Sequence, residues 1–171
     1  MQTNMLSLEE LAGKVGGDAG GALGVLLAYI GDQSGVYHAL EKKGPINCDA
    51  LAQETGLDSR YLREFLSANA AHGYVTYHQD TESFSLSEAQ AAIFAHEGTP
   101  TCMQGFFQAI VSQYTTHEAA LETFKSGNGR PWGEHDSCCF CGTDRFFRPG
   151  YEANLIDNWI PALEGVNEKL S

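Results

Sequence analysis

Apolar residues recur at three- and four-residue steps along much of the chain, which is the spacing of amphipathic helices. The first such run ends near Glu41, before the helix-stopping pair Gly44-Pro45, and predicts a long helix through Leu23, Leu26, Leu27, Ile30, Tyr37 and Leu40. Upstream, SLEE at 7–10 has the S-x-x-E pattern of a capping box and predicts a short first helix. The glycines of GKVGGDAGGALG, at 13–24, match no phosphate-binding pattern. They indicate a flexible joint between helices or close helix packing.

The pattern changes to a mixture of helix and strand in residues 45–86. INCDALAQETG (46–56) predicts a short helix, and LDSRYLREFLSANAAHG (57–73) predicts a second helix with Asp58 as its N-cap. Two short runs rich in β-formers follow, YVTYH at 74–78 and SFSLS at 83–87. Helix, turn, helix and hairpin in this order are the layout of a winged helix-turn-helix with a small β-hairpin wing.

Helical periodicity returns after the wing. We expect a short helix at 87–98, a longer one within 99–127, a break at NGRPWG (128–133), and a final helix from about Phe147 with Leu155, Trp159 and Leu163 on one stripe. The predicted fold is therefore mainly α, with flanking helices on both sides of the winged helix. The predicted divisions are 1–43, 44–86 and 87–171.

The charge argues against a nucleic-acid partner. Ten lysines and arginines stand against 22 carboxylates, a net charge of −12, and the three divisions carry −2, −4 and −6. A DNA-reading winged helix needs positive charge on its second helix and wing. Here the second helix offers Arg60 and Arg63 beside two carboxylates, and the wing, with Asp80 and Glu82, has no cation.

The sequence also predicts where in the cell the protein is found. It has no uninterrupted apolar run of the roughly 18 residues that a membrane span needs. The N-terminus carries glutamates where a signal peptide has lysine or arginine. We therefore expect a cytoplasmic protein that does not enter membranes and whose five cysteines are reduced thiols.

The segment WGEHDSCCFCGTDRFFRPGY, at 132–151, concentrates the candidate chemistry. His135, Cys138, Cys139 and Cys141 are soft metal ligands, but they lack the paired spacing of structural zinc sites, so a metal is not favoured. The alternative is that the cysteines act as small, half-buried apolar side chains. A redox role lacks a CxxC pair, although Arg145 could lower the pKa of a nearby thiol.

The aromatic residues of this segment are candidates for a pocket wall. His135 is the group that could act as a general base near neutral pH, and Arg145 and Arg148 could orient a carboxylate or pair with Asp144 and Glu152. We expect a small apolar or aromatic substrate, although any one of these residues could simply fill the core. The pocket candidates are Phe106, Phe107, Trp132, His135, Phe140, Arg145, Phe146, Phe147 and Tyr151.

Three stretches resemble the N-terminal region of class I S-adenosylmethionine-dependent methyltransferases that carry a winged-helix domain. They are YIGD (29–32), RYLREFLSANAAHGYV (60–75) and GTDRFFRPGY (142–151), and the resemblance extends over nearly the whole chain. It implies that residues 1–43 are dimerisation helices and that 87–171 form a substrate cap. In that family a Rossmann-like domain follows the cap and binds the methyl donor.

The sequence ends at GVNEKLS without the glycine-rich D-x-G-x-G loop of such a domain. We therefore expect a homodimerising, substrate-capping part of a methyltransferase that binds no S-adenosylmethionine by itself and is not catalytic alone. It is either a fragment or a natural short relative. Two alternatives stay open: a stand-alone winged-helix regulator responsive to thiols or metal, and a non-catalytic partner subunit of a methyltransferase.

Overall fold

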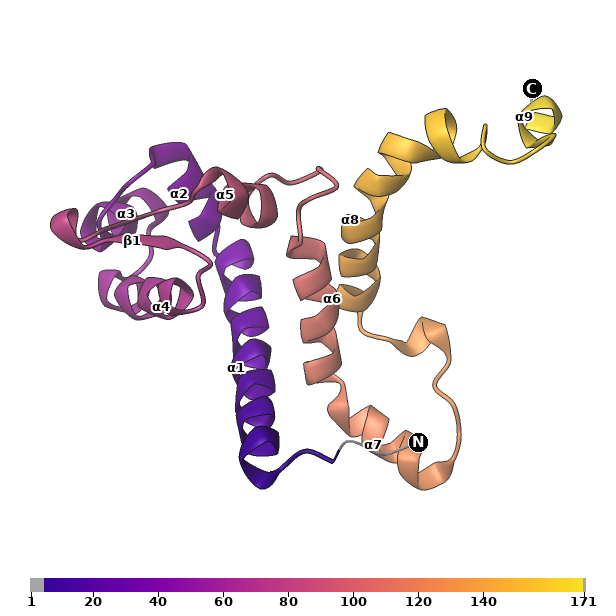
Figure 1. Cartoon of the computed structure of the whole chain (residues 1–171), viewed down its shortest axis with the longest axis horizontal. Helices are drawn as coiled ribbons and strands as arrows, with labels where there is room; N and C mark the ends of the chain where they lie inside the picture. Colours follow the sequence, from indigo (N-terminus) through magenta and orange to yellow (C-terminus); the bar gives the residue numbers. More distant parts are fainter. Residues whose placement is uncertain (1–4, 171) are drawn as a thin grey trace.

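The computed structural model describes residues 5–170 as a mainly helical chain with one small hairpin (Figure 1). This confirms the predicted fold class. The winged helix lies at one side, the long first helix stands beside it, and a helical pair lies on the other side of that helix. The first elements in chain order are α1 (Leu8–Gln33), α2 (Val36–Lys43), α3 (Cys48–Thr55), α4 (Ser59–Ala71), β1 (Thr76–His78), β2 (Ser83–Ser85) and α5 (Glu88–Phe94). After them come α6 (Gln104–Thr115), α7 (His117–Ser126), α8 (Ser137–Asn154) and α9 (Val166–Leu170).

The first helix corrects the prediction of a short helix followed by a long one, and of the two interpretations of the glycines at 13–24 it excludes the flexible joint, while Gly24 is closely packed against His72 and Tyr74. The Ser7 capping box is present, with the Ser7 amide donating to the Glu10 carboxylate at 2.8 Å, but α1 then runs unbroken through the glycines. The break comes later, at Gly35, whose φ of 73° lies in the left-handed region that glycine adopts without steric penalty. The residues expected to continue the long helix therefore form the separate α2.

The winged helix is built by local caps and one cross-connection. Asn47 and Asp58 cap α3 and α4, their side chains accepting from the amides of Ala50 at 2.9 Å and Tyr61 at 3.0 Å. The wing strands β1 and β2 pair antiparallel, and an isolated bridge between Ile46 and Phe84 joins the second strand to the segment before α3. The predicted helix-turn-helix and wing are confirmed.

The core of the winged helix includes residues from outside the predicted 44–86 division. Ala28 from α1, Tyr37 and Leu40 from α2, and Phe94 from α5 are buried in the same cluster as Leu66 of α4. The Tyr37 hydroxyl donates to the Asn69 side-chain oxygen at 2.6 Å inside this core. The neighbouring helices thus stabilise the winged helix, while the predicted division at 44 and 86 stays a prediction.

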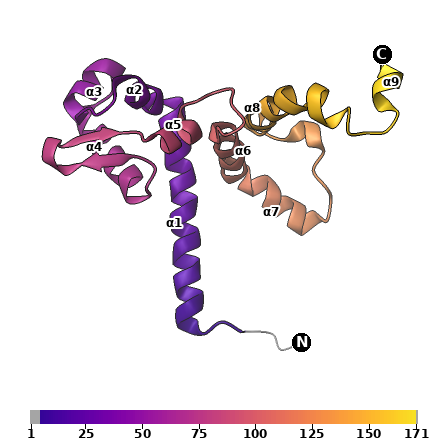
Figure 2. The same cartoon turned by 45° about the horizontal axis from the view of Figure 1, so that its top comes forward.

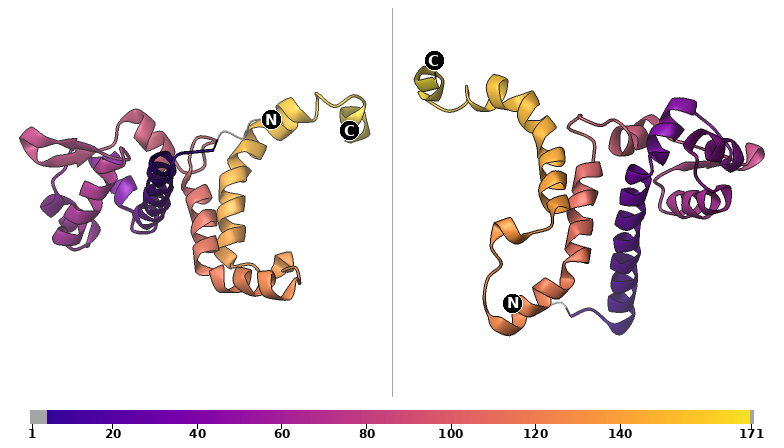
Figure 3. Two further views of the ribbon diagram at one scale, coloured as in Figure 1. Left: turned by 60° about the horizontal axis from the view of Figure 1, so that its bottom comes forward. Right: turned by 180° about the vertical axis from the view of Figure 1, so that it is seen from behind.

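Two glycines bring α6 and α8 into backbone contact. A Cβ atom added to Gly105 would lie 2.6 Å from the Phe146 amide nitrogen, and one added to Gly142 would lie 2.5 Å from the Ala109 nitrogen. Side chains larger than hydrogen at these two positions would separate the helices. The two helices accordingly lie side by side in every view (Figure 3).

The predicted helix boundaries in the last division need three corrections. The helix expected from Phe147 begins ten residues earlier, at Ser137, where Asp136 caps it. It does not continue to the end of the chain, because a π-helical turn at Leu155–Trp159 and further turns separate α8 from α9. The long helix expected within 99–127 is broken at Thr116, whose hydroxyl bonds back to the Ser112 carbonyl oxygen at 2.9 Å.

The N-terminal half of α1 projects away from the rest of the molecule (Figure 2). Residues 8–19 are exposed on every side of the helix, including Leu8, Leu11 and Val15. Only toward its C-terminal end does α1 pack on the body, where a Cβ added to Gly31 would lie 2.3 Å from the Tyr37 ring. Half of the longest helix therefore has no packing partner within residues 5–170.

Candidate functional site

Three of the predicted pocket residues lie together on one face of α8. Phe140, Phe147 and Tyr151 line an open hollow of about 570 Å³, together with Thr143, Asp144 and Arg148. Their spacing of seven and four residues places them on one side of the helix. The hollow is mostly apolar, apart from the ion pair between Arg148 and Asp144 at its edge.

The remaining aromatic candidates divide between this surface and the core. Phe106 packs on Phe146, with ring centroids 5.2 Å apart, and Phe146 meets Phe147 edge-on at 4.9 Å. These rings connect α6 to the hollow on α8. Phe107 instead lies buried among the core residues of the winged helix, its ring stacked 5.8 Å from that of Phe94.

His135 and Trp132 lie just before α8, in the turn that leads into it. The half-buried His135 ring lies 5.3 Å from the Trp132 ring, which in turn lies 5.1 Å from Phe140 at the hollow. This places the imidazole next to the aromatic surface. Its role as a general base stays a prediction, as does the role of the aromatic set as a substrate wall.

Arg145 is held in an ion-pair network that joins three parts of the chain. Its guanidinium donates to both carboxylate oxygens of Asp32, at 2.6 and 2.9 Å, and to both of Glu97, each at 2.6 Å. It also donates to the side-chain oxygen of Gln104 at 2.9 Å. Hydrogen bonds to Asp32 and Glu97 hold the pKa of the Arg145 guanidinium well above its usual range. Its donors are therefore already occupied by protein groups, which leaves little capacity for a substrate carboxylate.

Arg145 and Arg148 were both expected to pair with nearby carboxylates of their own segment, and only Arg148 does so. Arg148 pairs with Asp144 on the surface of α8, four residues away. Arg145 instead pairs with residues that are 113 and 48 positions distant in the sequence, and no helical spacing indicates such partners.

The cysteines of the 132–151 segment lie in the first two turns of α8 with three different environments. Cys139 is buried, Cys138 is half-buried and Cys141 is exposed. Successive residues of a helix point about 100° apart, so the three thiols do not converge. Across residues 5–170 no three of the histidine, cysteine and carboxylate side chains gather closely enough to hold a metal ion. The buried Cys139 instead accepts from the side-chain amide of Gln113, at 3.6 Å.

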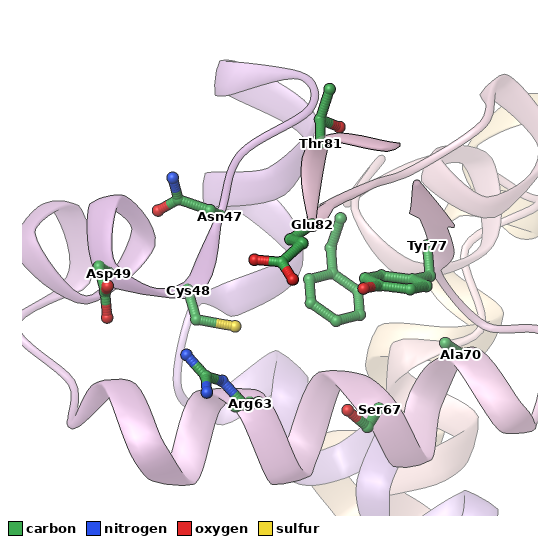
Figure 4. A pocket seen from close by; sticks show the side chains of 10 residues that line it. Asn47, Cys48, Asp49, Arg63, Ser67, Ala70, Tyr77, Thr81 and Glu82 are labelled. Atoms are coloured by element: carbon green, nitrogen blue, oxygen red, sulfur yellow. The ribbon is translucent and has the colours of Figure 1, made fainter. Parts of the chain in front are cut away.

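A second hollow lies in the winged helix, where the sequence predicted no pocket. It has a volume of about 440 Å³ and lies between the start of α3, the outer face of α4 and the wing (Figure 4). Cys48, Arg63 and Glu82 point toward one another across it, beside the ring of Tyr77. Arg63 and Glu82 were visible in the sequence only as charges of a DNA-reading surface, and nothing in the sequence indicated that they face each other.

Comparison with known proteins identifies part of the chain. Residues 21–96 match the family model of the Rv2258c-like winged HTH domain. Among curated proteins, none has a significantly similar sequence. None of the helices in residues 5–170 combines the length and apolar character that crossing a membrane requires.

Two solved structures share the fold. PigF, solved with SAH, superposes with a TM-score of 0.57 at 15% identity, over 95% of this chain and 50% of that one. The S-adenosylmethionine-dependent methyltransferase SibL, in its apo form, superposes with a TM-score of 0.54 at 14% identity, over 78% and 42%. Identities this low show a common fold alone, and this chain spans half or less of either structure. The expected winged helix-turn-helix fold is thereby confirmed: residues 21–96 match the Rv2258c-like winged HTH model, and the chain shares its fold with part of each of these two structures.

Proposed function

We propose that this chain is the dimerising and substrate-capping part of an S-adenosylmethionine-dependent methyltransferase. In this proposal α1 pairs with α1 of a second copy, and α8 supplies one wall of the substrate pocket. The methyl donor binds to a part of the enzyme that these residues do not form. The likeness of the fold to SibL supports this assignment, and the exposure of α1 is the observation that carries it.

The exposed apolar residues of α1 form one stripe along the helix. At 100° per residue, Leu8, Leu11, Val15, Leu23, Leu26 and Ile30 fall within one third of the helix circumference. The residues that pack on the body, Gly24, Ala28 and Gly31, lie on the opposite side. An apolar stripe of this length, left uncovered by residues 5–170, is typical of an interaction surface.

The glycines make the uncovered half of α1 unstable as an isolated helix. Gly13, Gly16, Gly17, Gly20 and Gly21 have nothing within 4 Å of an added Cβ. Each costs about 1 kcal/mol relative to alanine in a helix interior, or about 5 kcal/mol for the five. Without a packing partner the helix has no contacts to offset this cost, and a second copy with the same stripe would supply them.

The capping role rests on the hollow of α8 and its surroundings. Phe147, Tyr151 and Trp159 are large aromatic side chains that keep about half of their surface exposed. Tyr151 meets Trp159 edge-on at 5.4 Å, so the aromatic surface continues past the end of the helix. Such a wall suits a flat or apolar substrate held against a second protein surface.

Molecular mass in solution tests the pairing. We expect sedimentation velocity to give two chains of 18.5 kDa per particle for the wild type. Leu23→Glu places a charge on the stripe and should give a monomer. Phe124→Glu, at an apolar position of α7 that is 90% exposed, is the matched control and should stay dimeric. A monomeric wild type, or a dimeric Leu23→Glu variant, would contradict the proposal.

Calorimetry tests the proposal that these residues do not bind the methyl donor by themselves. The chain should show no heat of binding with S-adenosylmethionine, because the donor site is assigned elsewhere. Micromolar binding of the donor to these residues alone would show that the assignment is wrong. Co-purification with a longer methyltransferase, in place of a second copy, would favour the partner-subunit alternative.

A further inference from the structure

The hollow in the winged helix has the size and lining of a small-molecule site. Its volume of about 440 Å³ lies within the range of ligand pockets. Tyr77 and Phe84 form an aromatic floor, with ring centroids 4.9 Å apart, and Ala70 extends the apolar surface. Polar groups from three separate elements surround this floor, so the site combines an apolar base with a polar rim.

Arg63 brings a positive charge that the described part of the chain does not neutralise. Its guanidinium forms no salt bridge with any residue in 5–170. Its neighbour in the pocket is the buried Cys48 thiol, whose pKa is raised by burial although Arg63 opposes the shift. The thiol is therefore neutral at physiological pH, and the guanidinium is left to bind an anion.

Glu82 brings a negative charge from the opposite side of the pocket. It is the one residue other than glycine in 5–170 with a positive φ, at 46°. This left-handed conformation is unfavourable for a glutamate, and it directs the side chain from the wing into the pocket (Figure 4). The other carboxylate of the lining, Asp49, accepts a hydrogen bond from Ser59 and points away from the pocket centre.

The carboxylates on this face would oppose the binding of DNA. The outer face of α4 and the wing would meet the phosphates in a DNA-reading winged helix. Here Glu82 and Asp49 line the hollow on that face, and Glu64 lies on the same helix as Arg63. Phosphates would be repelled by these carboxylates, whereas a small zwitterion would meet one charge of each sign.

We infer that this hollow binds a small aromatic amino acid or a closely similar zwitterion. The carboxylate of the ligand pairs with Arg63, its ammonium group faces Glu82, and its ring lies on Tyr77 and Phe84. No covalent step is involved. The site is separate from the α1 stripe and from the α8 hollow, so it does not depend on the dimerising and capping role.

Three probes that share a phenyl ring and carry different charges test the inference by ligand-detected NMR titration. Phenylalanine carries both charges, phenylacetate the anion alone and phenethylamine the cation alone. Phenylalanine should bind most tightly, with a dissociation constant of about 1 mM or lower for a ligand of this size. Phenylacetate and phenethylamine should each bind more weakly, because phenylacetate lacks the contact with Glu82 and phenethylamine lacks the contact with Arg63.

Matched variants assign the contacts. Arg63→Met should weaken phenylalanine and phenylacetate by about tenfold or more, the effect expected from loss of a charge-assisted hydrogen bond. Arg60→Met is the control, because Arg60 lies over the Tyr61 ring on the same helix and does not line the pocket. Glu82→Gln should weaken phenylalanine and should not weaken phenylacetate, which has no ammonium group to face Glu82.

A variant that fills the hollow separates loss of binding from loss of folding. Ser67→Trp adds an indole within the pocket without altering either charge, and it should block phenylalanine while the circular dichroism spectrum is retained. The inference is overturned if phenylalanine does not bind the wild type, if phenylacetate or phenethylamine binds as tightly as phenylalanine, or if Arg63→Met and Arg60→Met behave alike. None of these results bears on the α1 pairing, which the mass measurement tests separately.

Discussion

Replacing Arg145 by methionine tests whether the ion-pair network holds the helices of this chain together. Asp32, at the end of α1, keeps only 4% of its side chain exposed and receives two hydrogen bonds from Arg145. Methionine retains much of the length and apolar volume of arginine and removes every donor. The variant therefore leaves a buried carboxylate without its counter-charge.

The magnitude follows from the burial of the pair. Breaking a buried ion pair by removing one partner destabilises a protein by about 3–5 kcal/mol. Arg145 keeps 24% of its side chain exposed and Glu97 keeps 43%, so water partly screens the network. We therefore expect a loss at the low end, about 3 kcal/mol. With a urea slope of about 2 kcal/mol/M for a chain of this size, the midpoint should fall by about 1.5 M.

Urea unfolding followed by circular dichroism measures the change, at one fixed chain concentration because association also affects stability. Arg148→Met is the matched control, since Arg148 lies one turn further along α8 and pairs with an exposed carboxylate, and its midpoint should not move. Asp32→Asn combined with Arg145→Met should recover part of the loss, because no buried charge remains. Equal midpoints for Arg145→Met and Arg148→Met would refute the reasoning.

Two further predictions concern helix contact and pH. Gly142→Ala should destabilise the chain by about 2 kcal/mol or more, because its Cβ would meet the Ala109 backbone at 2.5 Å. Gly150→Ala on the same helix has free space and should stabilise by up to about 1 kcal/mol, and equal effects in thermal unfolding would contradict the predicted contact. Burial raises the pKa of Tyr37, so its share of stability is present below the usual tyrosine pKa of about 10 and is lost as pH rises above it. Tyr37→Phe should lower the free energy of unfolding by about 1–2 kcal/mol at pH 7, because Asn69 is left without its donor. In urea titrations between pH 9 and about 11, the stability of this variant should fall less steeply with pH than that of the wild type.

Local chemistry explains what could be predicted from the sequence. Asp58 and the capping box at Ser7 marked helix starts because a cap depends only on residues three positions apart. The wing was visible because short β-rich runs separated by polar residues pair as neighbours. These features need no knowledge of the tertiary structure.

The misplaced boundaries arose where local preference and packing disagree. Glycine is a poor helix former, so the run at 13–24 left a joint and close helix packing as alternatives, and the close contact of Gly24 and Gly31 with aromatic side chains of the body is visible only in the structure. The start of α8 was missed because cysteines carry little helix signal, whereas Asp136 supplies the cap and Gly142 the contact with α6. Propensity alone does not reveal either contact.

The candidate site could be predicted only in part for the same reason. The seven- and four-residue spacing of Phe140, Phe147 and Tyr151 reveals that they share a face. The pairing of Arg145 with Asp32 joins two of the three stretches that carry the methyltransferase resemblance, but those stretches are 113 residues apart. The role of Arg145 as a connector between helices therefore emerged only from the structure.

The contact between Gly105 and Gly142 also determines where α8 can bend. At these glycines the backbones of α6 and α8 are in direct contact. The first turns of α8 are therefore fixed against α6 and move with it as one body. Seven residues later Pro149 has no amide hydrogen, which leaves the Arg145 carbonyl oxygen without its helical hydrogen bond. Beyond Pro149 a π-helical turn replaces regular helix. The two ends of α8 therefore differ: its first turns are fixed to α6 by backbone contact, whereas its end lacks one helical hydrogen bond and passes into the π-helical turn.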